Sequence, residues 1–70
     1  MFNIKIAENL KLLMKEKNIN QTQLSERIGV AQSAISAWLT KKKEPSITSL
    51  RLLSDFFDTT VDFIIGRKDY

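Results

Sequence analysis

The sequence contains neither cysteine nor histidine, and its 70 residues include only one proline and two glycines. Without cysteine there is no disulfide framework and no thiolate metal site, and without histidine the commonest general base and metal ligand is missing. The carboxylates that remain form no pair that stands out from solvated helix faces. We therefore expect a protein that is not an enzyme and that holds no metal and no cofactor.

Long apolar stretches are also missing, because no segment reaches the roughly 18 apolar residues of a membrane-spanning helix. Lys5, Glu8 and Lys11 interrupt the apolar start, which is unlike a secretory signal, so we expect a cytoplasmic protein with no membrane partner. Hydrophobic residues make up 43% of the chain, which is enough for one small helical core. We expect a single domain over 1–66, followed by a C-terminal tail over 67–70.

Apolar residues recur at helical spacing in five segments, which predicts helices over about 3–17, 21–28, 32–39, 47–57 and 61–65. The residues expected to cap their N-termini are Asn3, Asn20, Ser46 and Thr60. The third helix differs, because Ala31 stands at its N-cap position and offers no side-chain acceptor. The fourth helix is expected to bury a stripe made of Ile47, Leu50, Leu53, Phe56 and Phe57.

Residues 21–39 form the centre of this pattern, because two short helices there are joined by a tight turn at Gly29 and Val30. Glycine adopts the positive φ that such a turn requires at little cost. Asn20 and Gln23 have the spacing of a capping box, which would fix the start of the first of the two helices. Trp38 shares the inner stripe of the second, so we expect it in the core rather than stacked on a base.

This stretch resembles a helix-turn-helix of the Cro/phage-repressor family. The matching residues are Gln21, Leu24, Ser25, Ile28-Gly29-Val30, Gln32-Ser33, Ile35-Ser36 and Trp38, and the resemblance continues through 43–46, 50–57 and 61–66. It implies an all-α, five-helix, lambda-repressor-like DNA-binding domain with the helix-turn-helix in helices 2 and 3. It also implies a sequence-specific transcriptional regulator of bacterial or phage type, expected to be a repressor. Such proteins usually bind double-stranded, pseudo-palindromic operators as homodimers.

The resemblance places helix 3 in the major groove, with its outer face toward the base edges. The expected base contacts are Gln32, Ser33, Ser36 and Ala37, of which Gln32 is the strongest because a glutamine amide can bond adenine at two positions. The expected phosphate contacts are Gln21 and Thr22 at the start of helix 2, and Thr40, Lys41, Lys42 and Lys43 after helix 3. The alternative is that all of these are ordinary polar residues on a solvated surface.

The charge distribution agrees with contact to a polyanion. The net charge is +3 and the pI about 9.5. Three consecutive lysines, 41–43, follow helix 3, whereas the segment 52–66 contains three aspartates and neither Lys nor Arg. A basic end and an acidic end suit a domain that lays one face on nucleic acid.

The chain departs from the family pattern at one position in helix 1 and at another at the end of helix 3. Many members carry a buried Arg in helix 1 and a buried Glu at the end of helix 3, where this sequence has Met14 and Leu39. Replacing both partners of a buried ion pair by hydrophobic residues can be neutral or stabilising, so we expect these two side chains to touch. The Asn-Gly turn of the family is also replaced, by Thr40-Lys41.

Other functions remain open. A protein-interaction module with the same fold, such as an antitoxin, would need a more apolar outer face on helix 3. RNA binding is disfavoured because no aromatic platform is evident, and five short capped helices disfavour a membrane-surface peptide. No small-molecule effector is evident, and the end of the chain soon after Gly66 favours a whole small regulator.

The expected dimer surface is the last helix with the tail, through Val61, Phe63, Ile64, Ile65 and Tyr70. The alternative is that Val61, Ile64 and Ile65 close the core of the monomer.

Overall fold

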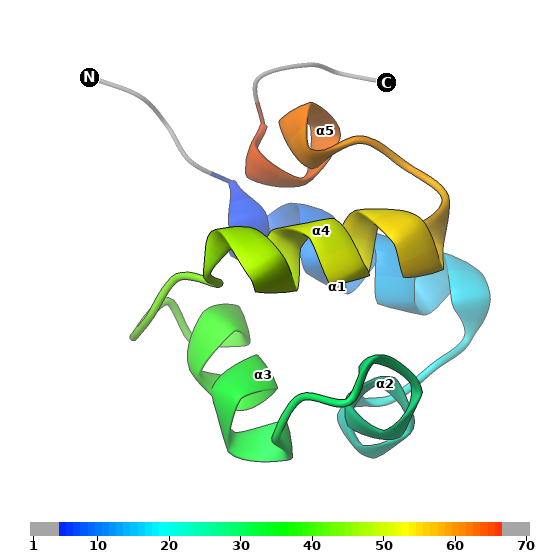
Figure 1. Cartoon of the computed structure of the whole chain (residues 1–70), viewed down its shortest axis with the longest axis vertical. Helices are drawn as coiled ribbons and strands as arrows, with labels where there is room; N and C mark the ends of the chain where they lie inside the picture. Colours follow the sequence, from blue (N-terminus) through cyan, green and yellow to red (C-terminus); the bar gives the residue numbers. More distant parts are fainter. Residues whose placement is uncertain (1–4, 67–70) are drawn as a thin grey trace.

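The computed structural model describes residues 5–66, which fold into five α-helices (Figure 1). The helices are α1 (Ile6–Lys17), α2 (Gln21–Ile28), α3 (Gln32–Leu39), α4 (Ile47–Phe57) and α5 (Val61–Ile65). Residues 5–66 contain no strand, so the prediction of a five-helix, all-α domain is confirmed. Among the described helices, none combines the length and the apolar character that a bilayer crossing needs. The expected tail over 67–70 lies outside the described residues.

A single hydrophobic core draws on every helix. Its fully buried side chains come one from each helix, and they are Leu10, Leu24, Ile35, Leu53 and Ile64. Burying a Leu or Ile side chain contributes roughly 1.5–3 kcal/mol, and a domain of this size has few such residues. Each helix is therefore held in place mainly by the apolar surface that it buries against the other helices.

Side-chain caps begin three of the helices where the sequence predicts them. Asn20 Oδ1 accepts from the Gln23 N–H at 2.8 Å, and Gln23 Oε1 accepts from the Asn20 N–H at 2.9 Å, which confirms the capping box of α2. Ser46 Oγ accepts from the backbone N–H of residue 49 at 3.1 Å, and Thr60 Oγ1 from that of Phe63 at 3.0 Å. These bonds satisfy N–H groups that have no partner inside the helix.

Two expectations about helices were wrong. α1 begins at Ile6 rather than at residue 3, because Lys5 has non-helical backbone angles and no side-chain capping bond. The expected cap, Asn3, lies outside the described residues. Ile47 continues the apolar stripe of α4 in sequence but is 86% exposed. α4 packs on α2 and α5, and the exposure of Ile47 shows that its first turn is not covered.

The remaining residues of the α4 stripe lie inward as expected. Leu53 and Phe57 are buried, and Leu50 and Phe56 are half-buried against the core. The rings of Phe56 and Phe57 pack edge-on, with centroids 4.9 Å apart. The Lys17 ammonium lies 5.2 Å from the centroid of the Phe56 ring.

Hydrogen bonds join α5 to the start of α1. Asn9 Nδ2 donates to the carbonyls of Phe63 and Ile64 at 2.8 and 3.3 Å, and the Lys5 N–H donates to the Ile65 carbonyl at 3.1 Å. The last carbonyls of a helix lack intrahelical partners, so these bonds replace water. Gly66 ends α5 with a φ of +88°, where a Cβ would lie 3.1 Å from Lys5 Cβ.

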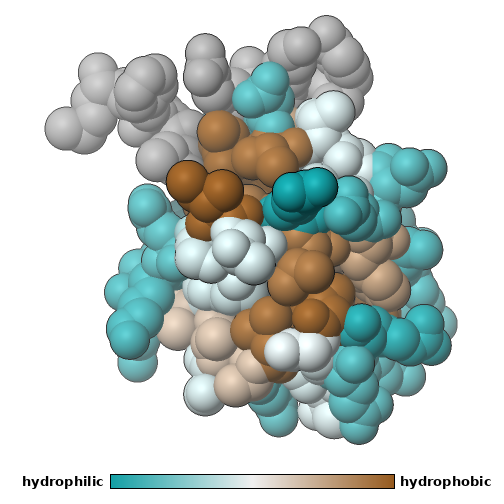
Figure 2. All heavy atoms as spheres, viewed as in Figure 1, coloured by the Kyte–Doolittle hydropathy of each residue, from teal (hydrophilic) through white to brown (hydrophobic). Residues whose placement is uncertain are grey.

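The residues of the expected dimer surface differ in how deeply they are buried. Ile64 is fully buried, so its expected place on that surface was wrong and the alternative, closure of the monomer core, is confirmed for it. Phe63 and Ile65 are half-buried against the core, and Val61 is also half-buried. Tyr70 lies outside the described residues. Figure 2 shows hydrophobic atoms exposed near α5, at one end of α4 and below α4 in the centre of this face.

The two residues that depart from the family pattern are Met14 in α1 and Leu39 in α3. Met14 and Leu39 are each 8% exposed and belong to one core cluster, which supports the apolar replacement. Trp38 is 5% exposed in the same cluster, so its expected place in the core is confirmed.

The two glycines provide a matched test of backbone and packing. Both have positive φ, but a Cβ on Gly29 would meet no atom within 4 Å, whereas one on Gly66 meets Lys5. We expect Gly29→Ala to lower the free energy of unfolding by about 1 kcal/mol, the cost of the left-handed backbone. Gly66→Ala should lower it by about 2–4 kcal/mol, because crowding is added. Equal losses in urea denaturation would contradict the close approach of α5 to Lys5.

Direct packing of Met14 on Leu39 remains a prediction, which a double-mutant cycle measures. Each truncation to alanine should cost about 2–4 kcal/mol, and the double variant should cost less than the sum by at least about 0.5 kcal/mol. Urea denaturation of the four proteins gives the coupling energy. Additive losses would show that the two side chains do not touch.

Candidate nucleic-acid interface

The turn between α2 and α3 has the geometry expected of a helix-turn-helix. Gly29 ends α2 with a φ of +74°, and the N–H groups of Gly29 and Val30 both donate to the Ser25 carbonyl, at 2.9 and 3.2 Å. Leu24 and Ile35, one on each side of the turn, are fully buried. The turn and this apolar contact fix the position of α3 against α2.

α3 has a buried inner face and a polar outer face. Ile35, Trp38 and Leu39 are buried, while the expected base contacts Gln32 and Ser33 are exposed at the helix start. Ser36 and Ala37, expected to share this role, are half-buried one turn further on. The N-terminal end of α3 therefore offers the most accessible hydrogen-bonding groups of the expected site.

The start of α3 has no side-chain cap, as the sequence predicts. Ala31 has extended backbone angles, and its carbonyl accepts the first hydrogen bonds from within α3, but no side chain caps the N–H groups before them. The helix dipole adds partial positive charge at this end. A start of this kind can accept an anionic group without displacing a capping side chain.

The expected phosphate contacts at the start of α2 are held by the capping box. Gln21 is the first residue of α2 and is half-buried, and Thr22, which follows it, is exposed. The Thr22 carbonyl accepts a hydrogen bond from Ser25 Oγ at 2.7 Å.

The segment after α3 folds back over the end of that helix. Thr40 Oγ1 donates to the Ser36 carbonyl at 2.9 Å, and the N–H groups of Lys42 and Lys43 both donate to the Ala37 carbonyl. Lys41 has a φ of +65°, a left-handed conformation that costs a non-glycine residue about 1–2 kcal/mol. Residues 40–43 are all exposed, as a role in phosphate contact would need.

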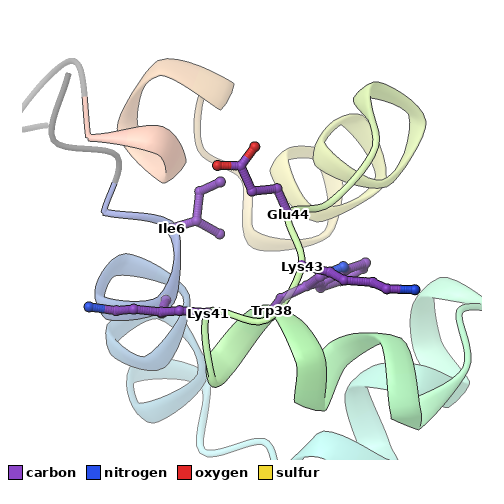
Figure 3. Close-up of a pocket in the computed structure, with 6 residues that line it drawn as sticks. Ile6, Trp38, Lys41, Lys43 and Glu44 are labelled. Atoms are coloured by element: carbon purple, nitrogen blue, oxygen red, sulfur yellow. The ribbon is translucent and has the colours of Figure 1, made fainter. Parts of the chain in front are cut away.

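The three lysines do not gather into one cluster. Figure 3 shows Lys41 and Lys43 pointing in opposite directions from the chain. Lys41 Nζ lies 3.2 Å from Glu8 Oε2 on α1, an ion pair whose side chains are 67% and 56% exposed. Sequence reasoning missed this pair, because its members are 33 positions apart and no local pattern joins them.

Glu8 stands in the first turn of α1. A hydrogen bond from its own backbone N–H, together with the bond from Lys41, holds the pKa of this carboxyl below its usual value. The side chain is therefore a carboxylate at neutral pH, and it cancels part of the charge that residues 41–43 were expected to offer.

Two surface hollows described among residues 5–66 are small, with volumes of about 120 and 240 Å³. One lies between the start of α1 and the segment after α3, has a volume of about 120 Å³, and is lined by Ile6, Ala7, Trp38, Lys41, Lys43 and Glu44 (Figure 3). Pockets for small organic ligands usually measure roughly 300–1,000 Å³. Within residues 5–66, no three metal-ligating side chains lie close enough to hold a metal ion.

Three aspartates lie apart from the basic segment 41–43. The basic segment 41–43 precedes the start of α4, whereas Asp55 and Asp58 lie at its other end and Asp62 in α5 (Figure 1). A polyanion on the α3 side would meet the lysines and avoid these carboxylates.

Comparisons with known proteins point to one family. Residues 10–64 match the family model described as Helix-turn-helix. The chain is 37% identical over 62 residues to the HTH-type transcriptional activator BcrR of Enterococcus faecalis, which covers 89% of this chain and 30% of that protein. It is 33% identical over 61 residues to the HTH-type transcriptional regulator AnsR of Bacillus subtilis, which covers 87% of this chain and 53% of that protein.

A solved structure, that of a transcriptional regulator from Listeria innocua, has the same fold. It matches with a TM-score of 0.84 and 26% sequence identity, over 93% of this chain and 61% of that one. These matches confirm the expected family resemblance and fold class. The family and the named relatives are transcriptional regulators, so the expectation that the domain is not an enzyme is confirmed. The chain spans between about a third and a little over half of the curated relatives.

The difference in capping between α2 and α3 gives a stability test. Ala31→Ser should raise the free energy of unfolding by about 0.5–1 kcal/mol by capping α3, whereas Asn20→Ala should lower it by about 1 kcal/mol by breaking the box on α2. Thermal and urea denaturation of both variants measure the changes. A destabilising Ala31→Ser would show that the start of α3 is already satisfied.

Proposed function

Because the chain belongs to the helix-turn-helix family, we propose that it is the DNA-binding domain of a transcriptional regulator and that it reads double-stranded DNA with α3 in the major groove. The observation that carries the proposal is the outer face of α3. Its N-terminal residues Gln32 and Ser33 are exposed and polar, while its inner face is buried against the core. A helix mounted in this way can enter the groove, which is about 12 Å wide, without unfolding any other part of the domain.

We assign base contact to Gln32, Ser33, Ser36 and Ala37. The Gln32 amide bonds the N6 and N7 atoms of adenine, and the exposure of this side chain leaves the amide free to reach them. The serine hydroxyls bond either donors or acceptors and discriminate less, and Ala37 offers only apolar contact, for example to a thymine methyl.

We assign phosphate contact to two flanking segments, Gln21 and Thr22 at the start of α2, and Thr40, Lys41, Lys42 and Lys43 after α3. These contacts position α3 in the groove and do not read sequence. Their exposure and the net positive charge support the assignment. Each lysine that neutralises a phosphate should steepen the salt dependence of binding by about 0.9 units of log–log slope.

We propose that the regulator is of bacterial or phage type and acts in the bacterial cytoplasm. We also propose that it binds a pseudo-palindromic operator as a homodimer. The candidate contact between the two copies is formed by the half-buried apolar residues of α5, which are Val61, Phe63 and Ile65.

We propose repression as the direction of control, because repression requires only that the operator be occupied.

The competing function is recognition of a protein by the same face, as in an antitoxin. That function favours a face enriched in aromatic and apolar residues, since these dominate the centres of protein interfaces. Gln32 and Ser33 at the exposed end of α3 do not fit this expectation, so DNA binding is preferred.

Repeated selection from random double-stranded DNA tests the proposed function. At about 150 mM salt, where non-specific binding is weak, we expect enrichment of a pseudo-palindrome with half-site centres about 10 base pairs apart. Binding that shows no sequence preference and fades with salt would contradict it. A pull-down against the α3 face would then test the protein-binding alternative.

Gln32→Ala tests the assignment of the base-reading residue. We expect it to cost about 1–3 kcal/mol and to relax preference at one base position of each half-site. Titration of base-substituted operators measures both effects. Thr48→Ala, at an exposed position of α4, serves as the control and should leave the preference unchanged. A uniform loss across all operators would make Gln32 a positioning residue instead.

A further inference from the structure

The Glu8–Lys41 pair joins α1 to the segment that follows α3. It is the only ion pair among residues 5–66, and it is exposed on both sides. Pairs of this kind contribute little to stability, because solvent screens them and ordering two side chains is unfavourable. The pair therefore does more to decide where the Lys41 ammonium points than to hold the domain together.

A carboxylate and a phosphate bind an ammonium group through the same kind of charge-assisted hydrogen bond. Glu8 Oε2, 3.2 Å from Lys41 Nζ, thus takes the place that a phosphate oxygen of DNA would take. Lys42 and Lys43 make no ion pair with any residue of 5–66, and Lys43 points away from Lys41 (Figure 3). Lys41 alone among the three lysines meets an internal competitor.

We infer that Glu8 competes with DNA phosphate for Lys41 and so limits the affinity of the domain for DNA. The inference rests on the proposed function. In the free domain the pair is closed, and when DNA binds, Lys41 reaches a phosphate only by leaving Glu8. Phosphate contact carries no sequence information, so Glu8 lowers affinity for operator and for unrelated DNA alike.

Glu8→Gln is the direct test, because it removes the charge and keeps the shape of the side chain. The probes are the selected operator and an unrelated duplex of the same length, about 20 base pairs, titrated at about 50 mM salt, where exposed charges are less screened. We expect Glu8→Gln to lower Kd for both duplexes by about two- to fivefold, the range that an exposed pair supports.

Glu16→Gln is the matched control. It makes the same change of charge on the exposed surface of the same helix, about 12 Å further along the axis. Because 12 Å is close to the Debye length at this salt, it reports the general effect of net charge, and it should lower Kd less than Glu8→Gln. Equal effects of the two variants would overturn the inference.

A double-mutant cycle shows whether Glu8 acts through Lys41. In a Lys41→Gln background, Glu8→Gln should lower Kd no more than Glu16→Gln does, because no ammonium remains to be released. Lys41→Gly repeats the test with a residue suited to the positive φ at this position. Circular dichroism and the unfolding midpoint verify that each variant folds.

The outcomes separate the inference from the function on which it rests. If the wild type binds neither duplex at any salt, the proposed function is wrong and the inference falls with it. If the wild type binds but the effect of Glu8→Gln persists in both Lys41 backgrounds, only the inference is wrong.

Discussion

The packing of α3 against α1 and α2 is the contact on which the rest of the structure depends. α3 has only eight residues, too few for a stable helix in water on its own. Burial of Ile35, Trp38 and Leu39 keeps it helical, and the opposite face is thereby turned to solvent. The burial that turns this outer face to solvent therefore also stabilises the core.

The ends of the helices show how local chemistry supports this arrangement. α2, α4 and α5 begin with side-chain caps, and α5 is also closed by Asn9 from α1. α3 begins without a cap and takes its stability from tertiary packing. The helix of the proposed DNA contact therefore begins, like α1, with N–H groups that no side chain caps.

Most of the fold follows from patterns that lie close together in the sequence. Helical spacing and capping residues predict the bounds of α2 to α5, the capping box of Asn20 and the burial of Trp38. Exposure of Ile47 was not predictable in this way, because it depends on which helices lie opposite the first turn of α4. The burial of Ile64 and the bonds of Asn9 likewise depend on how α5 docks on α1.

In the candidate site too, local sequence patterns predict some features, whereas others depend on tertiary contacts. The sequence places Gln32 and Ser33 on the outer face of α3, and the structure exposes them there. The run of three lysines suggests one basic patch, whereas the left-handed backbone at Lys41 and the carboxylate of Glu8 separate them. No local pattern reveals that contact, since it joins residues 33 positions apart. The roles of these residues on DNA remain predictions.

The central claim is that DNA binds the face formed by the start of α2, the outer side of α3 and residues 40–43. Titration of the ¹⁵N-labelled domain with a selected operator, followed by backbone amide chemical shifts, tests it most directly. The account predicts the largest shift changes at 21–22 and 32–43, with small changes at the acidic end formed by residues 55–62. Changes concentrated in α4 and α5, with α3 unaffected, would contradict it.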